Sequence, residues 1–130
     1  MIEKNNNIDE LYSIFKEYKE NYKPIINEFT NIYTYKIDNN VVAFLIFNIM
    51  YEKCEIIDIF VIDEYRRKHI AELLITNMLD DYTVENVTLE VSTKNISAIK
   101  LYEKLGFKVV ATRKNYYKDS DGLLMLREIR

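Results

Sequence analysis

The feature that most constrains the fold is a long apolar stretch followed by a helical pattern and a second strand-like stretch. Cys54 to Ile62 is apolar at almost every position, which is typical of a strand buried on both faces. A helix is predicted from about His69 to Tyr82, and Val84 to Val91 then predicts another strand. The inward stripe of that helix is expected to consist of Ile70, Leu73, Leu74 and Met78. A strand, a helix and a strand in this order predict a right-handed parallel unit inside a mixed sheet.

Other segments predict helices and antiparallel strands around this unit. A helix is expected from about Ile8 to Tyr22, capped by Asn7 or Asp9, and a short second helix from Pro24 to Phe29. The other expected elements are strands Ile32–Ile37 and Val41–Met50 around a turn at Asp38 to Asn40, a helix Ile96–Leu105 closed by Gly106, and a hairpin of Phe107–Thr112 and Leu123–Ile129 around Asp119 to Gly122. We therefore predict an α/β (α+β) fold, with a mixed, mostly antiparallel sheet flanked by helices and a central parallel strand–helix–strand unit.

Composition and charge narrow the class of protein. With 130 residues, 48% hydrophobic and 30% charged, the chain is expected to form a single globular domain over residues 1–130. The net charge of -3 implies no general attraction to nucleic acid. The first residues, MIEKNNNIDELY, lack the pattern of a secretory signal, and the longest apolar run is too short to span a bilayer. The expected location is cytoplasmic, without membrane attachment.

Cysteine and histidine counts exclude several chemistries. Cys54 is the single cysteine, so no internal disulfide forms, and its expected role is that of a small packed hydrophobic residue. One histidine and one cysteine do not build a usual zinc site, so no metal is predicted. No glycine-rich phosphate loop of the nucleotide-hydrolase kind is present, and no Ser-His-Asp arrangement surrounds His69.

A basic turn lies where the strand before residue 63 gives way to the helix after residue 69. The free amide groups at a helix start, together with the helix dipole, attract anions. Arg66, Arg67 and Lys68 add positive charge beside that helix start. The segment therefore predicts either an anion site or simply a solvated basic loop ahead of an amphipathic helix.

A second motif sets a carboxylate and a phenol twelve residues apart on neighbouring elements. Glu90 ends a strand, Tyr102 lies on the following helix, and the pair Tyr116-Tyr117 comes later. Three simpler interpretations stay open from these residues alone. Glu90 can be a strand-end acid facing water, Tyr102 a core tyrosine, and the tyrosine pair strand-favouring aromatics.

Together these motifs resemble the GNAT superfamily of acetyl-coenzyme A-dependent N-acetyltransferases, including the bacterial ribosomal-protein alanine N-acetyltransferases (the RimI type). The family's Arg/Gln-x-x-Gly-x-Gly/Ala loop is similar to residues 66–71, where Arg66 and Ala71 match and His69 replaces the first glycine. Asp63 stands where the family often has proline. The second match is more specific and consists of Leu89-Glu90-Val91, Asn95, the segment Ala98–Phe107 and Tyr116-Tyr117. The resemblance covers about residues 41–130.

The resemblance implies a role for each matched residue. Glu90 is expected to act as general base through water, and Tyr102 as the acid that protonates the departing thiolate. Tyr116 and Tyr117 are expected to shape the acceptor slot, while Ser92 occupies a position where close relatives often carry arginine. The residues expected to bind acetyl-CoA, with a backbone N–H of the first three facing the thioester oxygen, are Phe60, Val61, Ile62, Arg66, Arg67, Lys68, His69, Ile70, Ala71 and Asn95.

The expected activity is transfer of acetyl from acetyl-CoA to a primary amine by direct attack in a ternary complex. Reaching the neutral amine at pH 7 costs about 4–5 kcal/mol for lysine but about 1 kcal/mol for an α-amine, which favours a protein N-terminus. A ribosomal protein is the acceptor that the resemblance suggests. The alternatives are acetylation of a small-molecule amine or a lysine side chain, or a non-catalytic acyl-CoA-binding or interaction domain.

Overall fold

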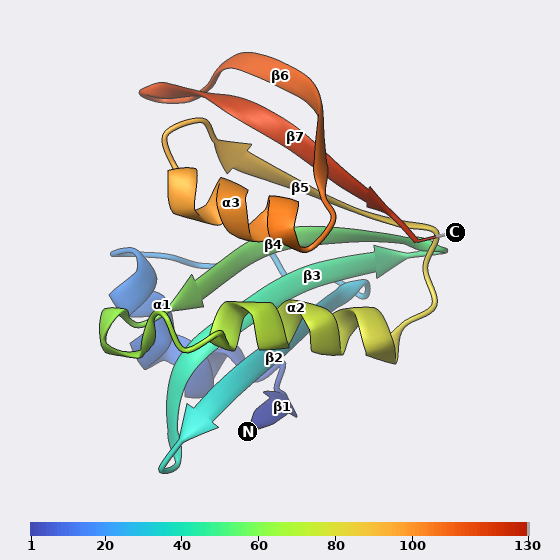
Figure 1. The fold of residues 1–130 in the computed structure, drawn as a ribbon. Helices are drawn as coiled ribbons and strands as arrows, with labels where there is room; N and C mark the ends of the chain where they lie inside the picture. Colours follow the sequence, from blue (N-terminus) through green and yellow to red (C-terminus); the bar gives the residue numbers. More distant parts are fainter. Residues whose placement is uncertain (130) are drawn as a thin grey trace.

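Seven strands form one sheet in the order β1-β2-β3-β4-β5-β7-β6 (Figure 1) in the computed structural model, which describes residues 1–129. The strands are β1 (Ile2–Lys4), β2 (Thr30–Ile37), β3 (Asn40–Met50), β4 (Lys53–Val61), β5 (Asn86–Ser92), β6 (Lys108–Tyr117) and β7 (Ser120–Glu128). The helices are α1 (Tyr12–Tyr18), α2 (Ile70–Asp81) and α3 (Ile96–Lys104), with 3₁₀-helices η1 (Ile8–Leu11) and η2 (Asp63–Tyr65). Among these strands only β4 and β5 pair in parallel, so the predicted mixed α/β fold is confirmed.

The central unit β4–α2–β5 forms as predicted, with one correction to the helix face. The buried residues of α2 are Ile70, Leu74, Ile75 and Met78. Leu73, which we expected on the inward stripe, is 44% exposed. The buried stripe follows the four-residue spacing of Ile70, Leu74 and Met78, and this spacing leaves Leu73 at its edge.

Helices cover both faces of the sheet. In Figure 1, α2 and α3 lie in front of the strands and α1 lies behind them. Side chains of β3 alternate between the two layers: Leu45 and Phe47 join the core beneath α2 and α3, whereas Phe44 and Ile46 join the core beneath α1. The middle of the sheet is therefore buried on both faces, and the candidate site described below lies toward the ends of β4 and β5.

The N-terminal region differs from the prediction. The helix expected through Tyr22 ends at Tyr18, because Lys19 is extended and Asn21 takes a left-handed φ of 60°. No helix spans Pro24 to Phe29. Asn27 instead forms a local turn, in which its side chain accepts from the Phe29 N–H at 2.9 Å, and such bonds compete with helical ones. The short edge strand β1 was not predicted.

The predicted turns fall close to where they were expected. Asp38 and Asn39 take left-handed φ angles of 52° and 66° at the β2–β3 hairpin, and Gly106 closes α3 with φ 94°. The last hairpin is longer than predicted, because β6 continues to Tyr117 and turns at residues 118–119. At the break in pairing after Arg113, the Asn115 N–H donates to Asp121 Oδ1 at 2.9 Å, which lets the strand continue. Within residues 1–129, no helix is long and apolar enough to cross a membrane.

Candidate active site between strands 4 and 5

The two parallel strands separate halfway along their length. β4 pairs with β5 only from Lys53 to Ile56, although β4 continues to Val61. A β-bulge at Ile57 accompanies the separation, because Ile56 and Asp58 pair with consecutive residues of β3 and leave Ile57 without a pair. Bulges bend a strand and increase its twist, which directs the end of β4 away from β5. The prediction that this strand is buried on both faces is wrong: Glu55 and Ile57 are exposed, the next three residues are half-buried, and only Cys54, Ile56 and Val61 are buried.

The free side of β4 presents backbone groups to this opening. The Ile62 N–H donates to the Val42 carbonyl at 2.9 Å, which fixes the alternation of the antiparallel ladder. Ile62 and Phe60 thus face β3, whereas the N–H and C=O groups of Val61 and Ile59 point to the open side. Of the three residues predicted to supply an oxyanion donor, Val61 has the orientation that the role requires.

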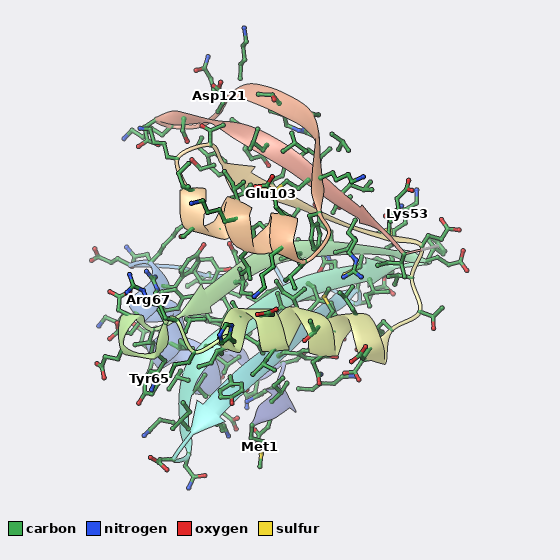
Figure 2. The ribbon with its side chains drawn as sticks, viewed as in Figure 1. Met1, Lys53, Tyr65, Arg67, Glu103 and Asp121 are labelled. Atoms are coloured by element: carbon green, nitrogen blue, oxygen red, sulfur yellow. The ribbon has the colours of Figure 1, made fainter. Side chains whose placement is uncertain are left out.

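A cleft of about 720 Å³ extends from this opening to the start of α2. Tyr65 and Arg67, labelled in Figure 2, belong to the loop between β4 and α2, far from Lys53 at the other end of β4. Ile62 and Lys68 are outside the cleft lining, and Lys68 Nζ lies 5.5 Å from the ring centre of Tyr65. The predicted acetyl-CoA-binding residues that do line the cleft are Phe60, Val61, Arg66, Arg67, His69, Ile70, Ala71 and Asn95.

The loop before α2 turns through left-handed backbone conformations. Arg67 and His69 have φ angles of 66° and 62°, a region that costs a non-glycine residue about 1–2 kcal/mol. The first helical bond of α2 runs from the Leu73 N–H to the His69 carbonyl, so the amides of residues 70–72 precede it. Those three amides lie at the positive end of the helix dipole and can donate hydrogen bonds to an anion.

Charged side chains hold this loop in place. Arg66 donates from Nε to the Val61 carbonyl at 3.2 Å and pairs with Asp63 at 3.1 Å. Glu72 accepts from Lys104 and His69, each at 3.2 Å, and these hydrogen bonds, first with Lys104 and then with His69, lower the pKa of Glu72. Lys104 thereby links α3 to α2 across the cleft.

A second cleft of about 590 Å³ lies on the other side of the opening. Glu90, Tyr102, Tyr116 and Tyr117, the residues predicted for catalysis and acceptor binding, all line it. Four residues line both clefts: Tyr18, Ile59, Asn95 and Tyr102. The structure therefore brings the predicted acid and base to one opening that joins two separate cavities.

Glu90 faces this second cleft and is not a solvated strand-end acid. Its side chain is 17% exposed and its Oε1 accepts from Arg113 Nε at 3.0 Å. Its Oε2 is buried and has no hydrogen-bond partner among residues 1–129. Arg113 thus holds one carboxylate oxygen in place, and the other oxygen accepts no hydrogen bond from residues 1–129.

Tyr102 belongs to the core and to both clefts at once. It is 5% exposed and packs edge-on against the ring of Phe107, with 5.9 Å between ring centres. Burial first, then the charges of Asp58 and Tyr117, raise the pKa of Tyr102 to about 12. The phenol is accordingly protonated at neutral pH. The core and functional interpretations of this tyrosine are both compatible with its position.

Sequence reasoning assigned no role to three residues of this site. Tyr18, at the end of α1, closes one side of both clefts, and its hydroxyl donates to Asp58 at 2.9 Å. Arg113, on β6, forms the ion pair with Glu90 on β5. The sequence carried a signal for Asp58, because it is an acid inside the apolar stretch Cys54–Ile62. The positions of Tyr18 and Arg113 depend on long-range packing, which no local pattern shows.

Comparison with known proteins shows which family the sequence matches. The chain matches the model of the acetyltransferase (GNAT) family over residues 5–107. It is 38% identical over 110 residues to an N-alpha-acetyltransferase from Saccharolobus solfataricus, covering 72% of this chain and 66% of that protein. It is 34% identical over 83 residues to the ribosomal protein bS18-alanine N-acetyltransferase of Escherichia coli (strain K12), covering 62% of this chain and 56% of that protein. The matched region thus spans less than two thirds of either relative.

Solved structures share the fold. The crystal structure of the ribosomal-protein-S18-alanine N-acetyltransferase from Escherichia coli has a TM-score of 0.86 at 23% identity, covering 99% of this chain and 93% of that one. A GNAT family acetyltransferase from Elizabethkingia anophelis, solved with acetyl-CoA bound, has a TM-score of 0.75 at 17% identity, covering 99% and 97%. Because the family model matches most of its length, the chain belongs to the acetyltransferase (GNAT) family.

Proposed function

We propose that this protein transfers an acetyl group from acetyl-CoA to the N-terminal α-amine of a protein. The observation that carries the proposal is Tyr102, a buried phenol at the junction of two clefts, with Glu90 in one of them. One cleft suits the thioester substrate and the other suits the amine. The activity named for the Saccharolobus solfataricus and Escherichia coli relatives supports the same reaction class.

The first cleft has the groups that a pantetheine diphosphate needs. The amides of residues 70–72, with Arg67 nearby, offer hydrogen bonds and positive charge to the diphosphate. The open N–H and C=O groups of Ile59 offer a donor and an acceptor to the pantetheine amides, since the Val61 carbonyl already accepts from Arg66. The Val61 N–H is the candidate donor to the thioester carbonyl oxygen, where negative charge develops as the amine attacks.

Glu90 is the proposed base. The amine enters from the second cleft as an ammonium ion and must lose one proton before its nitrogen can attack. Glu90, whose side chain is 17% exposed, takes that proton through an intervening water, while Arg113 on Oε1 keeps the carboxylate in position. The C–N bond then forms, and the C–S bond breaks as the tetrahedral intermediate collapses. The nitrogen loses its second proton in this step and the departing sulfur gains one, so the products are the amide and the CoA thiol.

Tyr102 is the proposed donor to the leaving sulfur. Its pKa of about 12 keeps the proton on the phenol at neutral pH. A thiol has a reference pKa of about 8.5, so the phenol shares its hydrogen with the developing thiolate more readily than it releases it outright. Burial of Tyr102 strengthens this hydrogen bond, because little water competes for it.

An α-amine fits the site better than a lysine side chain. The neutral form costs about 1 kcal/mol at pH 7 for the former and about 4–5 kcal/mol for the latter.

The direct test has two stages. Calorimetric titration with acetyl-CoA should show binding, and binding should weaken at high salt because the diphosphate site is electrostatic. The protein is then incubated with acetyl-CoA and two peptides of identical sequence, each containing one internal lysine. The first peptide has a free α-amine, and the second is Nα-formylated, so that only its lysine can react. Acetylation of the first peptide alone supports the proposal, whereas acetylation of lysine or of small polyamines alone, or no binding of acetyl-CoA, overturns it.

A further inference from the structure

Asp58 is an acidic residue that lines the second cleft, and the reaction proposed above does not use it. It follows the bulged Ile57 on β4, pairs with Ile46 across the sheet, and is half-buried. It lines the same cleft as Glu90 and Tyr117. Burial is the main cause that raises the pKa values of Tyr102 and Tyr117, and the negative charge of Asp58 is a smaller cause of both shifts.

Two tyrosine hydroxyls orient this carboxylate from one side. Tyr18 donates to Oδ1 at 2.9 Å, and Tyr22 donates to Oδ2. Their rings pack edge-on at 4.9 Å between centres and lie against Phe44, so both hydroxyls are held in place. Each carboxylate oxygen accepts one of these bonds and retains capacity for another. Both donors are neutral, because burial raises the pKa of each tyrosine, so neither brings a positive charge to Asp58.

Asp58 lacks the cationic partner that Glu90 has. Within residues 1–129, Arg113 pairs with Glu90, but no lysine or arginine forms an ion pair with Asp58. Lys19, which lines the same cleft, lies over the ring of Tyr18 at 4.9 Å. A partly buried charge without a counter-ion is unfavourable in the free protein, and a ligand cation removes that cost.

We propose that Asp58 binds the ammonium form of the acceptor amine, so that the second cleft selects cationic amines over neutral nucleophiles. This inference rests on the proposed function and adds the residue that recognises the acceptor. The aromatic rings of Tyr18, Tyr116 and Tyr117 line the same cleft as Asp58, and aromatic rings attract a compact cation. The proton of the bound ammonium still leaves through water to Glu90, so Asp58 affects acceptor affinity more than the chemical step.

The test separates acceptor binding from turnover. Asp58→Asn keeps the size of the side chain and one acceptor oxygen but removes the charge. Its KM for a peptide with a free α-amine should rise about tenfold or more, the loss expected for one charge-assisted bond, while kcat and the dissociation constant of acetyl-CoA change less than about threefold. Asp58→Glu should restore a KM close to that of the wild type. Asp80→Asn removes an exposed charge on α2 outside both clefts and should leave KM unchanged.

A binding readout needs no turnover. The peptide is titrated calorimetrically into protein saturated with CoA, and its Nα-acetylated form is titrated in parallel. The wild type should bind the free amine more tightly, and Asp58→Asn should lose that preference. If this preference is present but no peptide is acetylated, the proposed function fails while Asp58 keeps its assigned role.

A merely structural role for Asp58 gives a different pattern. Tyr22→Phe removes one hydrogen-bond donor to the carboxylate without changing the charge of Asp58, so it should lower Tm and raise the acceptor KM by clearly less than Asp58→Asn does. An unchanged KM in Asp58→Asn would overturn the proposal. So would equal losses in Asp58→Asn and Tyr22→Phe, because Asp58 would then serve only to anchor the segment after α1.

Discussion

The Nε atom of Arg113 lies 3.0 Å from Oε1 of Glu90, while Oε2 of the same carboxylate is buried without a partner among residues 1–129. The ion pair therefore engages half of the proposed base. Arg113 is 53% exposed in its side chain, so this pair is partly screened by water and adds little to stability. Its effect is to fix the direction in which Oε2 points.

This arrangement predicts unequal effects for the two partners. Glu90→Gln should lower kcat/KM by about a hundredfold, because a positioned base contributes about that much, and it should alter the pH–rate profile. Arg113→Gln should cost less, about tenfold or below, because Glu90 keeps its charge and loses only the contact that orients its carboxylate. Glu103→Gln, an exposed acid on α3 labelled in Figure 2, is the matched control and should behave like the wild type. Equal rates for Glu90→Gln and Glu103→Gln would remove Glu90 from the mechanism.

Tyr102→Phe tests the proposed donor to the sulfur. The variant keeps the packing against Phe107 and removes only the hydroxyl, so stability should change by less than about 1 kcal/mol. Turnover should fall about tenfold or more, while calorimetric affinity for acetyl-CoA stays within about twofold. Tyr51→Phe makes the same chemical change on a side chain that is 92% exposed and should have no effect. Turnover of Tyr102→Phe at the wild-type rate would contradict the assignment.

The loop before α2 yields a prediction about cofactor affinity. His69 holds a φ of 62°, which glycine adopts without strain. His69→Gly should therefore raise the free energy of unfolding by about 1 kcal/mol, offset in part by the entropy of the unfolded glycine. It should also tighten acetyl-CoA binding several-fold, because backbone can approach the diphosphate more closely.

Tyr51→Gly is the matched control for that gain. Tyr51 has a φ of 57° in the β3–β4 turn and lines neither cleft, so it should show a similar change in stability and no change in affinity. Thermal unfolding and calorimetry measure the two quantities separately. If both variants leave acetyl-CoA affinity unchanged, the histidine is not what limits cofactor binding.

Local sequence patterns predicted the elements that depend on local interactions. The β4–α2–β5 unit, the turn at Asp38-Asn39 and the stop at Gly106 each follow from hydrophobic period or backbone preference within a few residues. Glu90 and Tyr102 were singled out through the resemblance to the GNAT family, and the structure places both in the lining of the second cleft.

Features set by distant contacts were missed. The bulge at Ile57 and the separation of β4 from β5 depend on the register with β3, which no local pattern specifies. The pairing of Asp58 with Tyr18 and Tyr22 joins residues separated by 40 and 36 positions. That pairing also explains why the first helix ends early, since Tyr22 reaches the carboxylate only after the chain has left helical geometry.

A variant of Cys54 distinguishes direct attack by the amine from a route through a covalent acetyl-cysteine intermediate. The Cys54 thiol is buried beside Met78, lines neither cleft, and burial raises its pKa from 9.0 to about 12. The unfolded chain releases this proton near pH 9, whereas the folded chain keeps it until about pH 12. The folded state therefore binds more protons between pH 9 and 12, and its stability falls as the pH rises through that window. Cys54→Ala should retain wild-type turnover and lose part of this alkaline destabilisation, which denaturant titrations at pH 7 and pH 10 would measure. Loss of turnover in a variant that remains folded would instead indicate an acyl-cysteine intermediate.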